Sequence, residues 1–192
     1  MIAQTAVFVG VSPLDLYDAF VTPSLHSAMT ADGARPAVVL RGNDDAHVQR
    51  AEPGDRLRAV GIRRADGDFN FAVEADVLRA VPGEQLVLVW KNIAWRLAID
   101  PREVTPAPSI VVLGFHRNLA GAEIRLVQVE VPDYRVRLPL IIDELGDIER
   151  AERAAQHLAP GGEVGPLREI VNTHWSLVYW EPMKQFFAAR AR

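Results

Sequence analysis

The chain has 192 residues, of which 49% are hydrophobic and 24% charged, and its formal net charge is −4. This length and composition are typical of one globular domain and argue against a disordered chain. The acidic balance argues against nucleic acid as the main partner, because phosphate binding needs a concentrated basic surface. The absence of cysteine excludes disulfides, thiolate catalysis and cysteine-ligated metals.

No apolar run approaches the ~20 residues that a membrane-spanning helix needs. The first ten residues, MIAQTAVFVG, carry no basic leader and are typical of a strand, so we expect no export signal. Together these features predict a cytoplasmic protein without a membrane span.

The N-terminal part of the chain is expected to form one strand and two short helices. The strand covers Thr5–Val11. Ser-Pro and Thr-Pro pairs at residues 12–13 and 22–23 then each place a hydroxyl before a proline that suits the first helical position. Asp15 falls at the third position of the first helix, where a carboxylate favours the positive end of the dipole. The second helix is expected to run to about Met29.

Alternating apolar residues and turn signals predict a meander of antiparallel strands in the middle of the chain. The clearest strand is Phe69–Ala80, because its apolar residues (Phe69, Phe71, Val73, Ala75, Val77) and its polar residues (Asn70, Glu74, Asp76) fall on opposite faces. Asp-Gly at residues 66–67 and the segment Asn118–Gly121 are expected to form hairpin turns. The other predicted strands are Ala37–Leu40, Ala46–Ala51, Arg56–Ile62, Gln85–Lys91, Ser109–His116 and Glu123–Val131.

A helix is predicted between this meander and the C-terminal segment. Asp143–Leu158 places its apolar residues on one helical face, namely Leu145, Ile148, Ala151, Ala155 and Leu158. We interpret it as part of a helical insertion over residues 133–165. It either packs over the mouth of the domain or against a second copy, or it is a solvated surface helix.

The last segment, residues 167–192, has the spacing of a long helix with one face against a core. Its apolar residues recur at three- or four-residue steps, at Leu167, Ile170, Val171, Trp175, Val178, Tyr179, Met183 and Phe186. Pro166 suits the first helical position. Pro182 removes a backbone hydrogen bond inside the helix and is expected to kink it.

Four stretches of the chain resemble the SRPBCC superfamily of START-like and birch-pollen-allergen-like domains. They are SPLDLYDAFVTP at residues 12–23, PGDRL at 53–57, VLRAVPGEQLVLVW at 77–90 and WSLVYWEPMK at 175–184. In this order they are similar to the branch named after the activator of the 90-kDa heat-shock-protein ATPase. Residues 31–44 and 133–165 lie outside the resemblance.

The resemblance implies an α+β helix-grip fold for residues 1–192 as a single domain. In this fold a seven-stranded antiparallel curved sheet wraps around a long C-terminal helix. Two short helices follow the first strand, and here an extra helix is inserted before the last one. The fold alone does not fix the function.

The resemblance also implies an apolar cavity between the sheet and the C-terminal helix, which binds a hydrophobic or aromatic small molecule. An apolar cavity with a few placed polar groups is the usual form of a ligand site. The alternative is that the same side chains simply fill the interior. The candidate cavity residues are Phe69, Phe71, Val73, Val77, Trp90, Val171, His174, Trp175, Val178 and Tyr179.

Two further functions remain open. One is an enzyme of the polyketide-cyclase or aromatase type, in which His174, Tyr179 or the carboxylate of Glu74 assists proton transfer. Against it, His174 also fits a structural role, and Glu74 and Asp76 are expected to face water. The other is a chaperone-related protein-interaction role of the predicted helix Asp143–Leu158.

No signature of a metal or cofactor site is present, and no catalytic residue can be assigned. His26, His47 and His157 lie in separate elements without the spacing of metal ligands. The chain also lacks a nucleophile elbow, a phosphate loop and a dinucleotide fingerprint. We therefore expect no metal and no cofactor, and we leave a homodimer as an open alternative.

Overall fold

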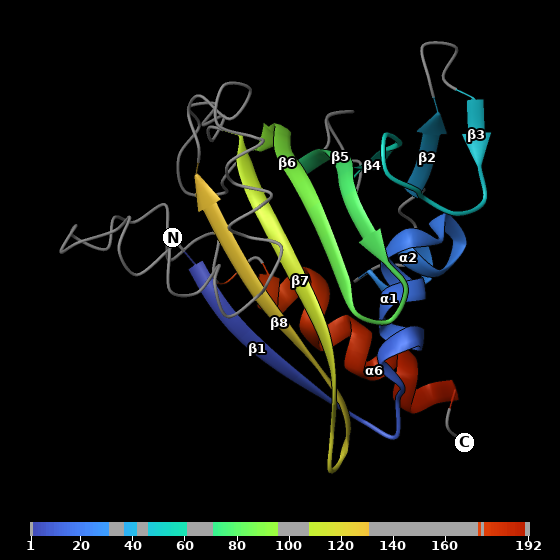
Figure 1. Ribbon diagram of the computed structural model, residues 1–192, viewed down its shortest axis with the longest axis vertical. Helices are drawn as coiled ribbons and strands as arrows, with labels where there is room; N and C mark the ends of the chain where they lie inside the picture. Colours follow the sequence, from blue (N-terminus) through green and yellow to red (C-terminus); the bar gives the residue numbers. More distant parts are fainter. Residues whose placement is uncertain are drawn as a thin grey trace, which may run out of the picture.

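The main feature of the structure, a computed structural model, is a curved antiparallel sheet with helices on one side (Figure 1). The structure describes residues 2–30, 37–41, 46–60, 71–95, 108–130, 173 and 175–190. The strands are β1 (Ile2–Val9), β2 (Ala37–Arg41), β3 (Ala46–Val48), β4 (Arg56–Val60), β5 (Phe71–Val81), β6 (Gln85–Trp95), β7 (Ser109–Asn118) and β8 (Gly121–Glu130). The helices are α1 (Pro13–Val21), α2 (Pro23–Met29), a π-helix η1 (Trp175–Trp180) and α6 (Glu181–Arg190).

The strand order is β1-β8-β7-β6-β5-β4-β2-β3, and every neighbouring pair is antiparallel. The predicted meander is therefore confirmed from β4 to β8. The expected number of seven strands is wrong, since eight are described. The short strand β3 pairs with β2 and adds the eighth strand at one end of the sheet.

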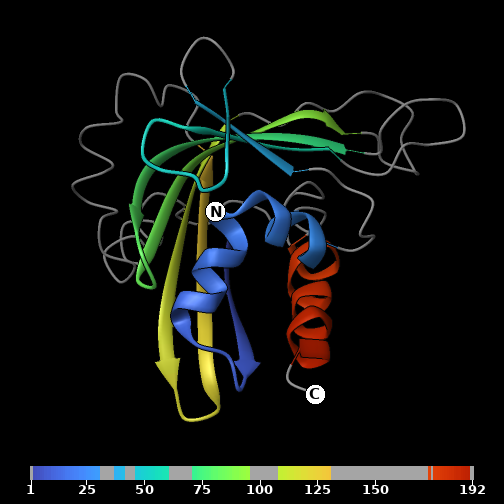
Figure 2. The same ribbon diagram turned by 90° about the vertical axis from the view of Figure 1, so that its right-hand side faces the viewer.

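The helices α1, α2 and α6 lie on the same side of the sheet, and the sheet curves around them (Figure 2). Buried apolar side chains from this face of the sheet and from the helices form one core cluster. This arrangement agrees with the α+β helix-grip architecture that the resemblance implied.

The start of α1 follows the predicted chemistry. The Oγ of Ser12 accepts a hydrogen bond from the Asp15 backbone N–H at 3.1 Å, and the Asp15 carboxylate accepts one from the Ser12 N–H at 3.1 Å. This reciprocal pair is a capping box, which satisfies two N–H groups that would otherwise have no partner. Pro13 occupies the first turn, as expected.

The central strands are buried on both faces. Leu86, Leu88 and Val111 belong to the core cluster on the helix side. The intervening residues of these strands point to the opposite face, and they too are buried, namely Val87, Val89, Ile110, Val112 and, on β8, Val127. Burial on both faces explains the continuous apolar runs in β6 and β7.

A kink was expected at Pro182, and the structure shows a π-helical turn, Trp175–Trp180, directly before α6. A proline inside a helix lacks the N–H donor, and its ring collides with the carbonyl four residues earlier. A π-helix has a wider hydrogen-bonding pattern than an α-helix, and this pattern accommodates the proline. It also sets which side chains of the segment face the sheet.

Gly121, at the turn between β7 and β8, is a position where only glycine fits. Its φ is +150°, and a Cβ there would lie 2.6 Å from the Phe8 carbonyl oxygen and 2.7 Å from the Gly10 nitrogen. We expect Gly121→Ala to lower the free energy of unfolding by about 1–3 kcal/mol, measured by urea denaturation. The matched control is Gly10→Ala, where φ is +68° but nothing lies within 4 Å. An equal loss in both variants would contradict the steric argument.

Several predicted elements lie outside the described residues. They are the Asp-Gly turn at residues 66–67, the helix Asp143–Leu158, the insertion 133–165 and the start of the C-terminal helix. The chaperone-related interaction assigned to that helix therefore stays a prediction. Within the described ranges, no helix is long and apolar enough to cross a membrane.

Candidate functional site

An aromatic cluster occupies the space between the sheet and the C-terminal helix. Trp90 projects from β6, and Trp175 and Tyr179 project from η1. The ring centroids lie 5.1 Å apart for Trp90 and Trp175, 4.7 Å for Trp175 and Tyr179, and 6.0 Å for Trp90 and Tyr179. Phe20 of α1 stacks on Tyr179 at 5.8 Å, and Trp180 stacks on Trp175 at 5.4 Å. Such contacts stabilise beyond the area that they bury.

A chain of hydrogen bonds holds Trp175 against the sheet. The indole Nε1–H of Trp175 donates to Gln128 Oε1 at 2.7 Å, and Gln128 Nε2–H donates to Ser109 Oγ at 2.7 Å. Trp175, Gln128 and Ser109 are all buried. Because an unpaired buried polar group is costly, this chain fixes the orientation of the Trp175 ring.

His26 is a second buried polar group beside the cluster. Its Nδ1 lies 3.1 Å from the Phe20 carbonyl oxygen, and its Nε2 lies 3.4 Å from the Tyr179 hydroxyl. A carbonyl can only accept, so Nδ1 carries the hydrogen and Nε2 presents a lone pair toward Tyr179. Burial lowers the pKa of His26 from 6.5 to about 4, although the hydrogen bond to Phe20 acts in the opposite direction. His26 is therefore neutral at pH 7.

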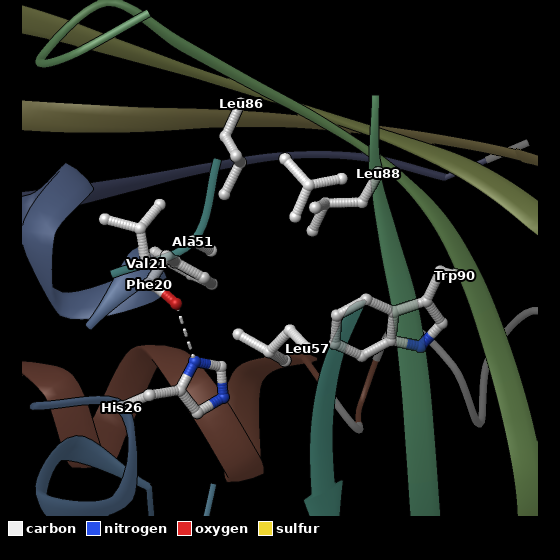
Figure 3. A pocket seen from close by; sticks show the side chains of 9 residues that line it. Phe20, Val21, His26, Ala51, Leu57, Leu86, Leu88 and Trp90 are labelled. Carbon is white, nitrogen blue, oxygen red and sulfur yellow. Dashed lines mark hydrogen bonds between the residues drawn. The ribbon is translucent and has the colours of Figure 1, made fainter. Parts of the chain in front are cut away.

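A small cavity lies next to His26 (Figure 3). Its volume is about 10 Å³, which is room for about one water molecule. The lining is apolar apart from the His26 ring. It is made by Phe20, Val21, His26, Ala51, Leu57, Val77, Leu86, Leu88 and Trp90.

The structure brings together about half of the predicted cavity residues. Val73, Val77, Trp90, Trp175 and Tyr179 are buried in the core cluster, and Val178 packs against it while partly exposed. The others lie outside the described residues or have side chains that are not described, namely Phe69, Phe71, Val171 and His174.

The carboxylates of β5 face away from this interior, as predicted. Glu74 lies 3.8 Å from Arg58 Nε, and Asp76 pairs with Arg56 at 3.1 Å and with Lys91. Burial alone raises the pKa of Asp76, but hydrogen bonds and charges of Lys91 and Arg56 outweigh it, so the net pKa is lowered. Neither carboxylate can act inside the interior.

Sequence reasoning missed the polar groups that meet the aromatic cluster. His26 had been considered only as a metal ligand, and Gln128 and Ser109 had not been considered at all. For His26 a signal was present, because His26 and Met29 are spaced as one face of a short helix and both are buried. Gln128 lies 47 residues from Trp175 along the chain, so no local pattern could have joined them.

The described residues hold no group of three or more His, Cys, Asp or Glu side chains that could bind a metal ion. Around the aromatic cluster the described residues offer aromatic surface, the neutral imidazole of His26 with its lone pair, the Tyr179 phenol and the amide–hydroxyl pair of Gln128 and Ser109. These groups can bind an apolar molecule and orient a hydroxyl or carbonyl group on it.

No family model matches the chain, and no curated protein sequence matches it. Several solved structures, however, match the chain. Protein MLL2253 from Mesorhizobium loti has a TM-score of 0.53 and 14% identity, with 98% of this chain and 96% of that chain covered. This likeness concerns the fold alone.

Two other solved structures are also similar over most of their length. The AHSA1 protein SPO3351 from Silicibacter pomeroyi has a TM-score of 0.44 and 17% identity, covering 82% of this chain and 97% of that chain. Protein Ms6760 from Mycobacterium smegmatis has a TM-score of 0.49 and 14% identity, covering 84% and 91%.

Proposed function

We propose that the chain binds a hydrophobic or aromatic small molecule between the concave face of the sheet and the C-terminal helix. The observation that carries the proposal is the aromatic cluster of Trp90, Trp175 and Tyr179, which meets two buried polar positions, His26 and Gln128. Ligand sites combine apolar walls with a few fixed polar groups in this way. The predicted residues Phe69, Phe71, Val171 and His174 remain part of the proposed site.

Binding requires this interior to open. A drug-sized ligand occupies a pocket of about 300–1,000 Å³, whereas the cavity beside His26 has a volume of about 10 Å³. We place the opening at η1, because π-helical turns occur frequently at functional sites and are less regular than α-helix. Movement of η1 displaces Trp175 and Tyr179 together and exposes Trp90 and the polar groups to the ligand.

The proposal predicts saturable binding of a hydrophobic probe such as 1-anilinonaphthalene-8-sulfonate, detected by tryptophan emission and by a rise in Tm. A ligand at 100 times its Kd raises the free energy of unfolding by about 2.7 kcal/mol. Trp175→Phe should weaken binding about tenfold, because it removes indole surface from the wall of the proposed site. Probe and variant are measured at a temperature where the variant is folded.

Leu177→Ala is the matched control, since Leu177 lies on the same π-helical turn but is 63% exposed. Its affinity for the probe should equal that of the unmodified chain. Equal losses in Trp175→Phe and Leu177→Ala would rule out the proposed site, as would the absence of saturable binding by a panel of aromatic and fatty-acid probes.

A second candidate function, an enzyme of the polyketide-cyclase or aromatase type, is favoured by one observation. The neutral imidazole of His26 lies 3.4 Å from the Tyr179 hydroxyl inside an apolar interior, a setting in which proton transfer can be tuned. In this reading His26 joins the predicted Tyr179 as the acid–base pair, Glu74 is left out because it faces away from the interior, and His174 stays a candidate. Unchanged turnover of a polyketide substrate by Tyr179→Phe would exclude it.

A further inference from the structure

Among the described strands, β1 forms a long open edge of the sheet. Its neighbour is β8, with which it pairs over eight residues, Ile2–Val9, without a bulge. No described strand lies on its other side, as Figure 1 shows at the blue strand. The opposite edge, β3, has only three residues. A long edge is a template for pairing with another strand, because its backbone N–H and C=O groups are unpaired.

Two contacts show which backbone groups of β1 face β8. The N–H of Gly10 donates to the Ala120 carbonyl at 2.9 Å, and the Phe8 carbonyl oxygen lies against Gly121. In an antiparallel strand the N–H and C=O of one residue point to the same side, and the sides alternate along the chain. The even-numbered residues therefore face β8. The residues that face the open edge are Ala3, Thr5, Val7 and Val9.

The same four residues have exposed side chains. Val7 is 43% exposed and Val9 78% exposed. The sequence of β1, IAQTAVFV, contains no charged residue and no proline. Natural edge strands are commonly protected from pairing by lysine, by proline or by a bulge. The strand β1 itself has none of these three protections.

We propose that β1 pairs antiparallel with β1 of a second copy of this chain, which makes one continuous sheet across a two-fold axis. In the register that aligns Thr5 with Val7 and Ala3 with Val9 of the other copy, all outward N–H and C=O groups of the edge find partners. A two-fold interface needs a surface that complements itself. An uncharged strand meets this condition, because it brings no like charges together.

Two further features of the edge favour this partner. The directly opposed side chains, Thr5 and Val7, are both β-branched, and such cross-strand neighbours stabilise a sheet. Beside the edge, a hollow of about 240 Å³ lies between β1 and α6, lined by residues that include Phe8, Val9 and Phe187. The hollow leaves room on the helix side of the sheet for side chains of the second strand.

The oligomeric state and the exchange of individual amides test the proposal together. Sedimentation velocity and light scattering of the full chain should show a mass near twice 21.2 kDa that decreases on dilution. Hydrogen exchange by NMR should show the Thr5, Val7 and Val9 amides protected in proportion to the dimer fraction. The Ala6 and Phe8 amides face β8 and should be protected at every concentration.

Three variants test whether the dimer forms through the β1 edge. Val7→Lys places a charge on the edge and should raise the dimer Kd at least about tenfold. Leu119→Lys adds the same charge at the fully exposed β7–β8 turn and should leave Kd unchanged. Thr5→Pro removes one outward N–H but no bond to β8, and it should weaken the dimer as well.

A chain that stays monomeric at the highest attainable concentration would overturn the proposal. So would a dimer in which the Thr5 and Val7 amides exchange freely, or one that Val7→Lys and Leu119→Lys affect equally. Because β1 pairing does not depend on ligand binding, failure of the probe experiments would leave this result standing.

Discussion

Trp175→Ala is expected to lower the free energy of unfolding by about 3–5 kcal/mol, the usual range for truncation of a buried tryptophan. The side chain is 1% exposed. It contacts the rings of Trp90, Tyr179 and Trp180 at centroid distances of 4.7–5.4 Å. Its removal leaves a cavity beneath η1 and leaves Gln128 without its donor. Urea denaturation followed by circular dichroism measures the loss.

Two companion variants separate packing from hydrogen bonding at this position. Trp175→Phe keeps most of the ring but leaves the Gln128 acceptor unpaired, which costs about 1–3 kcal/mol. Leu177→Ala, on the exposed side of the same turn, should change stability by no more than about 0.5 kcal/mol. A loss below about 1 kcal/mol in Trp175→Ala would mean that the aromatic cluster does not support the fold.

Acidification from pH 6.5 to pH 4 is expected to remove about 3 kcal/mol of stability through His26 alone. Its pKa is 6.5 in the reference state and about 4 in the folded protein, and each pKa unit corresponds to about 1.4 kcal/mol. Between pH 6.5 and pH 4 the His26 imidazole is protonated in the unfolded chain but stays neutral in the folded protein. Unfolding therefore becomes more favourable as the pH falls. Above pH 6.5 the histidine is neutral in both states, and its contribution is complete.

His26→Asn isolates this contribution, because the amide can still donate to the Phe20 carbonyl but does not titrate. The variant should be less stable than the unmodified chain at pH 7, and the difference should shrink as the pH falls to 4. His47→Asn is the control, since His47 is exposed on β3, and it should keep the original pH profile. Parallel stability curves for His26→Asn and the unmodified chain would contradict the prediction.

Local patterns in the sequence predicted the structure correctly where one helix or strand determines its own conformation. The Ser12 cap of α1 lies within four consecutive residues and is present as predicted, and the structure adds the reciprocal bond from the Ser12 N–H to the Asp15 carboxylate. The burial of Val73 and Val77 against the partial exposure of Glu74 follows from alternation along one strand. The helical spacing of Trp175 and Tyr179 correctly placed both residues in the core.

Contacts between distant segments of the chain could not be predicted from such local patterns. The count of seven strands was wrong because it came from the resemblance, whereas the segment Ala46–Ala51 was itself predicted as a strand and contains β3. His26 meets Tyr179 across 153 residues, and Trp175 meets Gln128 across 47. Hydropathy patterns report which side of an element is apolar, but they carry no information on which polar group lies opposite.

The helices, the strands and their apolar faces thus follow from hydrogen bonding and side-chain geometry within a few residues of each position. Two features depend instead on the assembled fold: the nearly filled interior beside His26 and the open edge that β1 forms among the described strands. Each arises where segments far apart in the chain meet or fail to meet. Their free energies depend on close packing and on buried hydrogen bonds, which exist only once the tertiary structure has formed.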